Sequence, residues 1–424
     1  MRARSAAPDQ AGPAELDSLV RRYGSPLYVY RLDSVRRAHA DLRSVLPEPS
    51  VLYYSLKANP HPALAAALAA AGCRAETSSR GELDTALDRG FSPADCLYTG
   101  PGKTDDEIHH ALSAGVRRFS AESAAELHRL GSAARALGTE AFVLLRVNGT
   151  AAGTTGLRMT GAASQFGVDE ARVRAAPGEF LAVPGARLVG VHLYPLSNAR
   201  DEASLIAAFR SSIALAARLR DDLGFPMGVV DLGGGFAAPY GGPGARPTYP
   251  ALRQALEEDL DARFPGWRAG RVEVAFESGR YLVGDSGLLA VTVRDVKTSR
   301  GQVFVVVDAG INHLGGMSGL GRLARAGITP EPAGAPTTTA SLVGPLCTPA
   351  DVLGRGVAVP EVGVGGLLSI PNVGAYGLSA SLLAFLSRPV PAEVVVDGGA
   401  VVAATRARLI HESLPVADGE AGEA

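Results

Sequence analysis

Between residues 50 and 280, short apolar or β-branched runs alternate with amphipathic stretches rich in Ala and Leu. This alternation is typical of βα units, in which a helix returns the chain to the next strand of a parallel sheet. It predicts strands near residues 51–56, 74–77, 96–99, 117–120, 141–147, 187–193, 228–232 and 272–276. Helices are expected at 62–71, 81–88, 105–114, 123–137, 203–223 and 249–264, with a less regular one after Asp169. Eight such units predict a closed (β/α)8 barrel of about 230 residues.

After Tyr281 the pattern changes to strand-like runs separated by Gly and Pro, which predicts a second, mainly β domain. Its strands are expected near residues 288–296, 303–307, 367–370, 393–396 and 401–409. We therefore expect the barrel to span residues 34–281 and the β domain to span 282–424. The segment 26–30 (PLYVY), within residues 1–33, is expected to add a strand to the later sheet, and residues 1–13 and the tail from Ala417 are expected to be disordered.

Composition excludes several classes of function. The 41 Lys and Arg residues nearly balance the 43 Asp and Glu residues, so no basic field invites nucleic acid. The longest apolar run, residues 63–71, is about half the ~20 residues that a membrane helix needs, and the first residues lack the apolar stretch of a signal peptide. A cytoplasmic location is expected. Cys73, Cys96 and Cys347 form no CxxC pair, so neither a disulfide framework nor a metal site is indicated.

Reactive side chains fall where the predicted barrel strands end. In a (β/α)8 barrel these carboxyl ends carry the active site. Only three of the 41 cationic residues are lysines, Lys57, Lys103 and Lys297, and the first of these follows the first strand. The other strand ends supply two carboxylates, an imidazole, a glycine turn and an arginine, namely Glu76, His192, the turn Gly233, Gly234 and Gly235, Glu277 and Arg280.

This set of groups matches the needs of pyridoxal phosphate (PLP). A lysine leaving a buried strand is desolvated, which favours the neutral amine that forms a Schiff base, although a lysine at a barrel rim can also be merely structural. Glycine N–H groups can cradle a phosphate, and a carboxylate such as Glu277 can keep the pyridine nitrogen protonated. The glycine turn also matches the dinucleotide-binding pattern GxGxxA, but by chance, because the Pro and Gly residues that follow it prevent the required helix. Gly102-Lys103-Thr104 matches the end of a P-loop, also by chance, because the first glycine of that motif is missing.

Five motifs carry a family resemblance over nearly the whole chain. They are YYSLKANP around Lys57, DLGGGF at 231–236, ESGRYLV at 277–283, GPLCTPAD at 344–351 and GAYGLSAS at 374–381. The chain thereby resembles the fold-type III PLP decarboxylases, the diaminopimelate and ornithine decarboxylase group. That resemblance implies an alanine racemase-like fold, in which the (β/α)8 barrel is followed by a β domain.

The resemblance also implies roles for individual residues. Lys57 would form the Schiff base with PLP, Glu277 would contact the pyridine nitrogen, His192 would stack on the ring, and Glu76 would lie beside the cofactor. Phosphate would be held by Gly234, Gly235, Gly279, Arg280, Ser197 and Tyr376. Cys347 would be the catalytic thiol, supplied across the interface of a homodimer with shared active sites, with Thr348 and Asp351 on the substrate side.

Departures from the family pattern bear on the substrate. Relatives whose substrates end in an ammonium group usually have an acidic residue after the cysteine, and here it is Thr348. With the motifs at 164–171, 308–314 and 385–396, this is similar to a branch that decarboxylates amino acids tethered through their distal carboxyl to acyl-carrier proteins in antibiotic biosynthesis. Two further positions depart from the family pattern. In the segment HLYPLSNA (192–199), the family normally has Gly, then Ser or Thr, and Gln after the histidine. At position 278, Ser stands where the family usually has proline before Gly279.

Three alternatives remain open from the sequence. The first is a decarboxylase of a free amino acid such as diaminopimelate or ornithine. The second is a racemase of the same fold that uses Cys347 as one of two bases. The third is a non-enzymatic PLP-binding protein, but such proteins resemble the barrel alone, and the β domain with Cys347 and Tyr376 argues against it.

Overall fold

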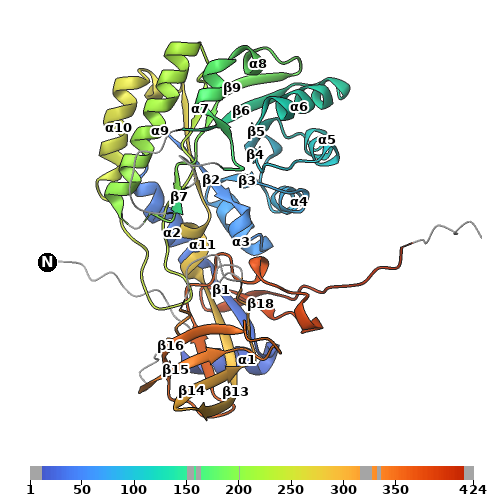
Figure 1. The fold of residues 1–424 in the computed structure, drawn as a ribbon, viewed down its shortest axis with the longest axis vertical. Helices are drawn as coiled ribbons and strands as arrows, with labels where there is room; N and C mark the ends of the chain where they lie inside the picture. The colour runs from blue at the N-terminus through green and yellow to red at the C-terminus, as the bar shows by residue number, and fades with distance from the viewer. Residues whose placement is uncertain are drawn as a thin grey trace, which may run out of the picture.

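Eight parallel strands close into a barrel, and a mainly β domain adjoins it (Figure 1). The computed structural model describes residues 12–149, 157–158, 164–199, 201–315, 327–331 and 336–414. Adjacent strands pair in parallel around the barrel, and the pairing of β5 with β6 completes the circle. The barrel strands are β2 (Val51–Ser55), β3 (Arg74–Thr77), β4 (Cys96–Tyr98), β5 (Arg118–Ala121), β6 (Ala141–Asn148), β9 (Ala186–His192), β11 (Val229–Asp231) and β12 (Glu273–Ser278). The predicted fold class is confirmed.

Helices surround the barrel (Figure 1). They are α2 (Leu32–Val45), α3 (Pro62–Ala70), α4 (Arg80–Asp88), α5 (Asp105–Ser113), α6 (Ala124–Ala136), α9 (Glu202–Leu223) and α10 (Leu252–Arg263), with the short α7 (Glu170–Ala175), α8 (Gly178–Leu181) and α11 (Arg280–Val283). Local sequence fixes several starts: Thr104 and Glu107 form a capping box at α5, and the Ser123 hydroxyl accepts a hydrogen bond from the backbone of Glu126 at α6. The expected helix at 249–264 begins three residues late, at Leu252.

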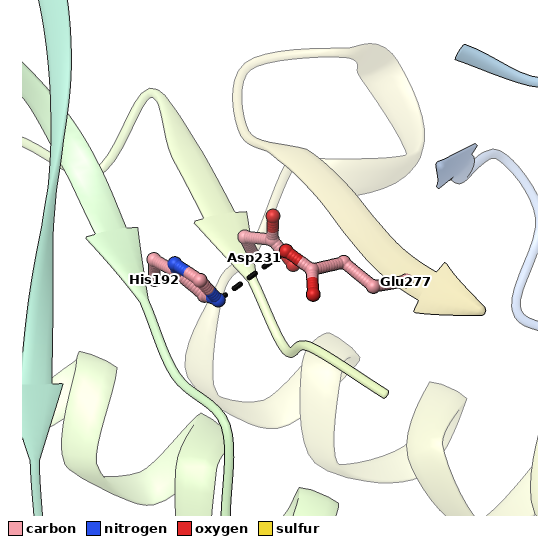
Figure 2. Close-up of side chains that lie close together, drawn as sticks. All are labelled: His192, Asp231 and Glu277. Atoms are coloured by element: carbon pink, nitrogen blue, oxygen red, sulfur yellow. Dashed lines mark ion pairs between the residues drawn. The ribbon is translucent and has the colours of Figure 1, made fainter. Parts of the chain in front are cut away.

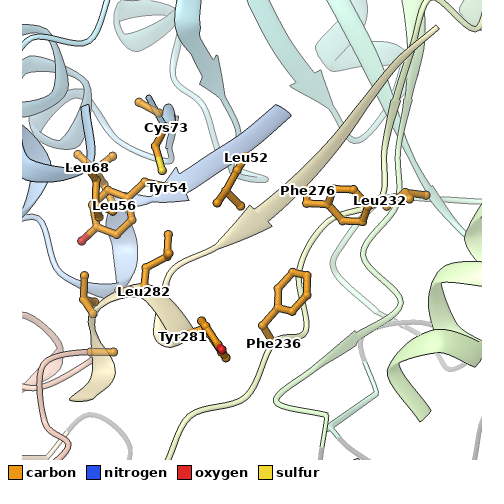
Figure 3. Packing of buried hydrophobic residues seen from close by; sticks show 14 of the residues in the cluster. Leu52, Tyr54, Leu56, Leu68, Cys73, Leu232, Phe236, Phe276, Tyr281 and Leu282 are labelled. Atoms are coloured by element: carbon orange, nitrogen blue, oxygen red, sulfur yellow. The ribbon is translucent and has the colours of Figure 1, made fainter. Parts of the chain in front are cut away.

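The strands alternate their side chains between two packed layers. Tyr53 of β2 points into the barrel, where it packs with Leu97, Leu144, Val229 and Ala275. Its neighbours Leu52 and Tyr54 instead join the large core between barrel and helices (Figure 3), together with Leu68 of α3 and Phe276 of β12. This period of two is the side-chain period of a strand, and it leaves the barrel filled with side chains.

Charged side chains join the strands where they begin. Glu273, the first residue of β12, accepts hydrogen bonds from Arg118 at 2.6 Å and from Arg74 at 2.9 Å. Arg118 also donates to the hydroxyl of Tyr53 at 2.6 Å. Because active sites of this barrel lie at the opposite, carboxyl end, this network serves stability and leaves the other end for chemistry.

The second domain is built on a sheet with strand order β16-β15-β14-β13-β1-β18-β19, and β17 also pairs with β13. Its strands are β1 (Leu27–Arg31), β13 (Gly287–Ser299), β14 (Gln302–Val307), β15 (Thr337–Val343), β16 (Val352–Pro360), β17 (Leu367–Ile370), β18 (Ala392–Asp397) and β19 (Ala400–Thr405). The segment PLYVY forms β1, which runs antiparallel to β13 and parallel to β18. The strand expected at 401–409 ends at Thr405, and β15 and β16 were not predicted.

Shorter elements complete the described chain. Helix α1 (Pro13–Tyr23) packs Leu16 and Leu19 on Leu27 and Val29 of β1. Strand β8 (Val168–Asp169) extends the barrel sheet beside β6, and β7 (Leu157–Arg158) pairs with β10 (Leu196–Ser197). Most of the segment 1–13 and all of 417–424, expected to be disordered, lie outside the described residues. No helix within the described ranges is long and apolar enough to cross a bilayer.

Backbone hydrogen bonds join the two domains at the end of β2. The side-chain amide of Asn59 donates to the carbonyl of Gly374 at 2.8 Å, and the backbone N–H of Tyr376 donates to Ala58 at 2.7 Å. Both bonds are made by the residues that directly follow Lys57, which lies in a 3-10 turn (Leu56–Ala58) after β2. The motif GAYGLSAS of the β domain is thereby fixed against the carboxyl end of the barrel.

His61 gives a test of this arrangement at the start of α3. Its Nδ1 accepts the backbone N–H of Ala63 at 3.2 Å, its Nε2 lies 3.1 Å from the hydroxyl of Thr405, and burial lowers its pKa to about 4. Between pH 6.5 and 4 the unfolded chain therefore binds a proton that the folded chain does not, so the free energy of unfolding falls with falling pH by at most about 1.4 kcal/mol per pH unit from this residue.

We expect His61→Asn, which keeps an N-capping side chain, to lose this acid-dependent contribution. Urea unfolding of wild type and variant from pH 7 to pH 4 measures it, and the variant's free energy of unfolding should fall less steeply. His109→Asn, on the exposed face of α5, is the matched control. Parallel curves for wild type and His61→Asn would contradict the assignment.

Candidate active site

A cavity of about 360 Å³ opens at the carboxyl ends of the barrel strands. Its lining combines strand ends with loops of both domains: Lys57, Glu76, Ser78, Thr99, Gly100, Pro101, Gly102, Lys103, Glu107, Arg146, Phe166, His192, Tyr194, Ser197, Glu277 and Tyr376. A smaller recess of about 20 Å³ adjoins it and shares five of these residues; the others that line it are Ser55, Asn198, Gly235, Phe236, Ser278, Gly279 and Arg280. The residues predicted from the ends of separate strands are thus brought together.

Lys57 and Glu76 form an ion pair at the mouth of the cavity. The ammonium of Lys57 lies 3.1 Å from both carboxylate oxygens of Glu76, whose side chain is 1% exposed while that of Lys57 is 39% exposed. Burial alone would lower the pKa of Lys57, but the carboxylates of Glu76 and Glu277 raise it. Sequence reasoning considered desolvation alone, which favours a neutral amine, whereas the carboxylate of Glu76 acts in the opposite direction.

Glu76 is held in its charged form by hydroxyl groups as well as by Lys57. Burial would raise its pKa, but the Lys57 ammonium and hydrogen bonds from Ser55 and Thr99 lower it. The Thr99 hydroxyl donates to Glu76 Oε1 at 2.5 Å, and Ser78 lies at 3.4 Å from the same oxygen. These contacts fix the carboxylate so that it faces the amine.

His192, Asp231 and Glu277 converge from three neighbouring strands, β9, β11 and β12 (Figure 2). Each of the three side chains offers one nitrogen or oxygen atom, and these three atoms all lie within 4.8 Å of one another. His192 Nε2 is 3.3 Å from Glu277 Oε1, and its Nδ1 lies 2.8 Å from the hydroxyl of Ser120. Burial lowers the pKa of His192 well below its usual value, and the cations Arg146 and Lys57 add to this effect.

Burial raises the pKa values of both carboxyl groups in this cluster. Burial, with Glu76 and Asp231 nearby, raises the pKa of Glu277 well above its usual value. Burial likewise raises the pKa of Asp231 to about 7, although its Oδ1 accepts the backbone N–H of Gly233 at 2.9 Å. Carboxyl groups with raised pKa values hold protons more readily than exposed carboxyls do and are a poorer match for a cation, which prefers ionised carboxylates.

The cluster leaves polar atoms free to receive a ligand. Both carboxyl oxygens of Glu277 and Nε2 of His192 are buried without a hydrogen-bond partner among the described residues, since their 3.3 Å contact lacks hydrogen-bonding geometry. Buried groups of this kind ordinarily have partners. A protonated carboxyl at this position fits a pyridine nitrogen, because it can give the nitrogen its proton and then form an ion pair with it.

The glycine turn and the loop after β12 fit a phosphate. A Cβ at Gly234 would lie 2.8 Å from the carbonyl of Glu277, and one at Gly279 would lie 2.6 Å from Ala58 Cβ, so neither position accepts a side chain without movement. Gly235 has φ +126°, which L side chains rarely adopt. Within the described chain, no hydrogen bond uses the backbone N–H of these three glycines. Arg280 adds a cation, stacked 4.8 Å above the ring of Tyr376.

The β15–β16 loop does not place its predicted residues in this cavity. Of the described residues that line either cavity, none is Cys347, Thr348 or Asp351. Cys347 is exposed, and the hydroxyl of Thr348 accepts the backbone N–H of Ala350 at 3.3 Å. Asp351 is 3% exposed, and its carboxylate accepts the backbone N–H groups of Ile311 at 2.8 Å and Leu346 at 2.7 Å. The substrate contact expected for Asp351 is not supported, because both oxygens hold the loop that carries the cysteine.

Sequence reasoning missed Arg146, Tyr194 and Asp231. Arg146 lies in β6 and donates to Glu122 at 2.8 Å, with its guanidinium 4.8 Å above the ring of Phe166. The sequence did contain a sign that Arg146 is functional, because it is the one charged residue in the strand AFVLLRVN. Asp231 was inside a quoted motif, DLGGGF, whose glycines alone drew attention.

Lys103, the second unusual lysine, has a structural role. Its ammonium is buried and donates to the carbonyls of Gly100 and Ser120 and to Glu126, at 2.6, 2.7 and 2.6 Å. Three oxygens surround the ammonium, so it supports the cavity wall rather than reacting in it.

A barrel that presents a lysine, a proton-holding carboxyl and a phosphate cradle at one mouth defines a PLP-dependent enzyme of fold-type III. The family model described as pyridoxal-dependent decarboxylase, pyridoxal-binding domain, matches residues 32–284, and the chain belongs to this family. It is a PLP-dependent amino acid decarboxylase, that is, a carboxy-lyase with pyridoxal phosphate as cofactor.

Individual relatives cover most of the chain. The L-glutamyl-[BtrI acyl-carrier protein] decarboxylase of Niallia circulans is 31% identical over 398 residues, which is 91% of this chain and 92% of that protein. The diaminopimelate decarboxylase of Archaeoglobus fulgidus is 32% identical over 390 residues, covering 91% and 90%. Among solved structures, diaminopimelate decarboxylase from M. jannaschii in complex with L-lysine superposes with a TM-score of 0.80 at 27% identity, covering 91% and 90%.

The role of Asp351 can be tested by stability. We expect Asp351→Ala to lower the free energy of unfolding by roughly 2 to 4 kcal/mol, because two buried backbone N–H groups lose their acceptors. Asp351→Asn, which keeps one acceptor oxygen, should cost less. Asp295→Ala, at a half-exposed site on β13, is the control. Urea unfolding measures all three, and an Asp351→Ala variant as stable as the control would show that the loop does not need this carboxylate.

Proposed function

We propose that the chain decarboxylates an acidic amino acid tethered through its side-chain carboxyl, as a thioester, to an acyl-carrier protein, in antibiotic biosynthesis. The observation that carries the proposal is Thr348. An ammonium-tipped substrate in this position would need a countercharge, whereas a neutral thioester needs only a hydroxyl or backbone contact. The match to a relative whose name describes an acyl-carrier-bound glutamyl substrate supports the same proposal.

In this proposal each predicted residue has one task. Lys57 holds the cofactor covalently, with Glu76 fixing the amine, and His192 lies against the ring. Glu277 meets the pyridine nitrogen, and the phosphate enters the recess formed by Gly234, Gly235, Gly279, Arg280, Ser197 and Tyr376. When bound, PLP supplies an electron sink for the charge left on the α-carbon as carbon dioxide departs.

The proposal further places Cys347 in the site of a second copy of the chain. It lies on an exposed loop and does not line the cavities of its own chain. Supplied across the interface of a homodimer, its thiol would donate the proton to the α-carbon. Two complete sites would then require two chains.

A chemical label tests the lysine assignment. We expect borohydride reduction of the wild-type protein to leave a pyridoxyl group on the peptide that contains Lys57. Lys57→Ala should carry no label and should lose turnover by several orders of magnitude, because the covalent attachment is removed. Lys297→Ala, on an exposed strand, should keep both label and turnover. A label located by mass spectrometry on Lys103 or Lys297 would refute the assignment.

Subunit mixing tests the shared site. Lys57→Ala and Cys347→Ala proteins should each be inactive, but co-refolding equal amounts should restore about a quarter of the wild-type turnover, because half of the dimers would contain one intact site. Each variant refolded alone is the control. A mixture as inactive as its components would show that Lys57 and Cys347 act within one chain.

The second candidate function is decarboxylation of a free amino acid. It is favoured by the match to several diaminopimelate decarboxylases that are 30–32% identical over at least 90% of the chain.

A comparison of free and tethered substrates decides between the two candidates. We expect aspartyl or glutamyl carrier thioesters to lose the mass of one carbon dioxide, and the free acids to release it at least about tenfold more slowly, which corresponds to some 1.4 kcal/mol in activation free energy. Thr348→Asp should reduce turnover of the thioester and Thr348→Ser should retain it. Equal release from free and tethered substrates would remove the case for tethering, and a racemised acid in place of an amine would identify a racemase.

A further inference from the structure

Two of the three departures from the family pattern, those at 192–199 and at Ser278, fall in the small recess. Tyr194 belongs to the segment HLYPLSNA, and Ser278 stands where the family usually has proline. Tyr194 follows β9 and Ser278 ends β12, so they reach the recess from different strands. Each brings a hydroxyl group to a space that is also lined by Gly279 and Arg280.

The side chain of Tyr194 lies against the glycine turn. A Cβ at Gly233 would lie 2.7 Å from Cδ2 of Tyr194, and a Cβ at Gly234 would lie 3.1 Å from its hydroxyl oxygen. Two cations lie near the ring of Tyr194: Lys57 Nζ at 5.8 Å and the guanidinium of Arg146 at 5.7 Å from the ring centre. Cation–π attraction to both stabilises the position of the ring. The ring is thereby held with its hydroxyl directed at the turn.

Neither hydroxyl is used by the protein itself. The buried hydroxyl of Ser278, in a residue that is 5% exposed, has no partner in the described ranges. For the Tyr194 hydroxyl, the groups that shift its pKa are burial and neighbouring charges, with no hydrogen bond among them. A buried hydroxyl without a partner costs free energy unless a ligand supplies one. Burial raises the pKa of Tyr194 to about 12, so its phenol keeps its proton and can donate.

We propose that the hydroxyls of Tyr194 and Ser278 donate hydrogen bonds to the phosphate of the cofactor. A phosphate monoester carries close to two negative charges and several acceptor oxygens. The recess offers it one guanidinium, that of Arg280, besides backbone N–H groups and the hydroxyls. This inference rests on the proposed role of the recess as the phosphate site.

Cofactor titration tests the inference without measuring turnover. Cofactor-free wild type, Tyr194→Phe and Ser278→Ala are titrated with PLP and with pyridoxal, which lacks the phosphate, and bound cofactor is followed by its visible absorbance. We expect each variant to bind PLP roughly tenfold more weakly, the loss typical of a hydrogen bond to a charged group, with unchanged binding of pyridoxal. Tyr281→Phe, whose hydroxyl instead donates to Pro247 at 3.3 Å, is the matched control and should bind both as wild type does.

Two results would overturn the inference for both hydroxyls, and a third would overturn it for Tyr194. One is unchanged PLP binding in both Tyr194→Phe and Ser278→Ala. The other is equal weakening of PLP and pyridoxal, which would place the hydroxyls at the ring. A Tyr194→Ala variant that binds PLP more tightly than wild type does would show that Tyr194 narrows this recess of about 20 Å³. That result also overturns the role of Tyr194.

Arg280→Met separates failure of the inference from failure of the proposed site. If this variant loses selectivity for PLP over pyridoxal while the hydroxyl variants keep it, the recess binds phosphate and only the role of the hydroxyls is wrong. If Arg280→Met also keeps the selectivity, the recess is not the phosphate site and both proposals fail. Thermal melting of each variant establishes that it is folded, and Ser278→Ala keeps the test available if Tyr194→Phe is unstable.

Discussion

The ion pair between Lys57 and Glu76 depends on the parallel pairing of β2 with β3. Lys57 follows β2, and Glu76, 19 positions later in the sequence, lies near the carboxyl end of β3, so the two ends lie side by side. Parallel pairing continues around all eight strands, so side chains from β9, β11 and β12 face the same mouth. A shift of one residue in the register of β2 would turn Lys57 away from Glu76, because successive side chains of a strand face opposite sides.

The β domain completes this mouth from outside the barrel. Tyr376 lines both cavities, and its own backbone N–H donates to Ala58, the residue after Lys57. Asn59 donates to Gly374 in the same segment, so two hydrogen bonds hold the motif GAYGLSAS against the end of β2. Strand β1 lies within the β domain's sheet, between β13 and β18, and leads directly into α2 of the barrel. The chain therefore passes from the β sheet to the barrel and back, which ties the two domains at both of their ends.

Periodicity and motif spacing predicted the barrel, the location of its helices and the set of strand-end residues that meet there. They could not predict interactions between side chains from distant parts of the chain. Desolvation of Lys57 was foreseen, but the charge that Glu76 imposes on it depends on a distance that sequence does not contain. For Asp351, a place in a family motif suggested substrate, whereas its carboxylate is consumed by backbone N–H groups of Ile311 and Leu346. Arg146 escaped notice because its strand reads as apolar and buried, although a single charge in such a strand is itself informative.

Burial raises the pKa of both carboxyl groups in the site, but their neighbours drive the two pKa values apart. For Glu76, the ammonium of Lys57 and hydroxyl donors outweigh burial and lower its pKa, whereas for Glu277 burial is reinforced by the nearby carboxyls of Glu76 and Asp231. Pairs of titratable groups with pKa values driven apart mark separate acid and base functions within one site. The ionised Glu76 lies beside the amine of Lys57, and Glu277, whose pKa is raised, lies near the end of β12 and lines the smaller recess. The two carboxyl groups therefore offer a bound ligand different contacts: Glu76 supplies an acceptor beside Lys57, and Glu277 supplies a proton at the border of the recess.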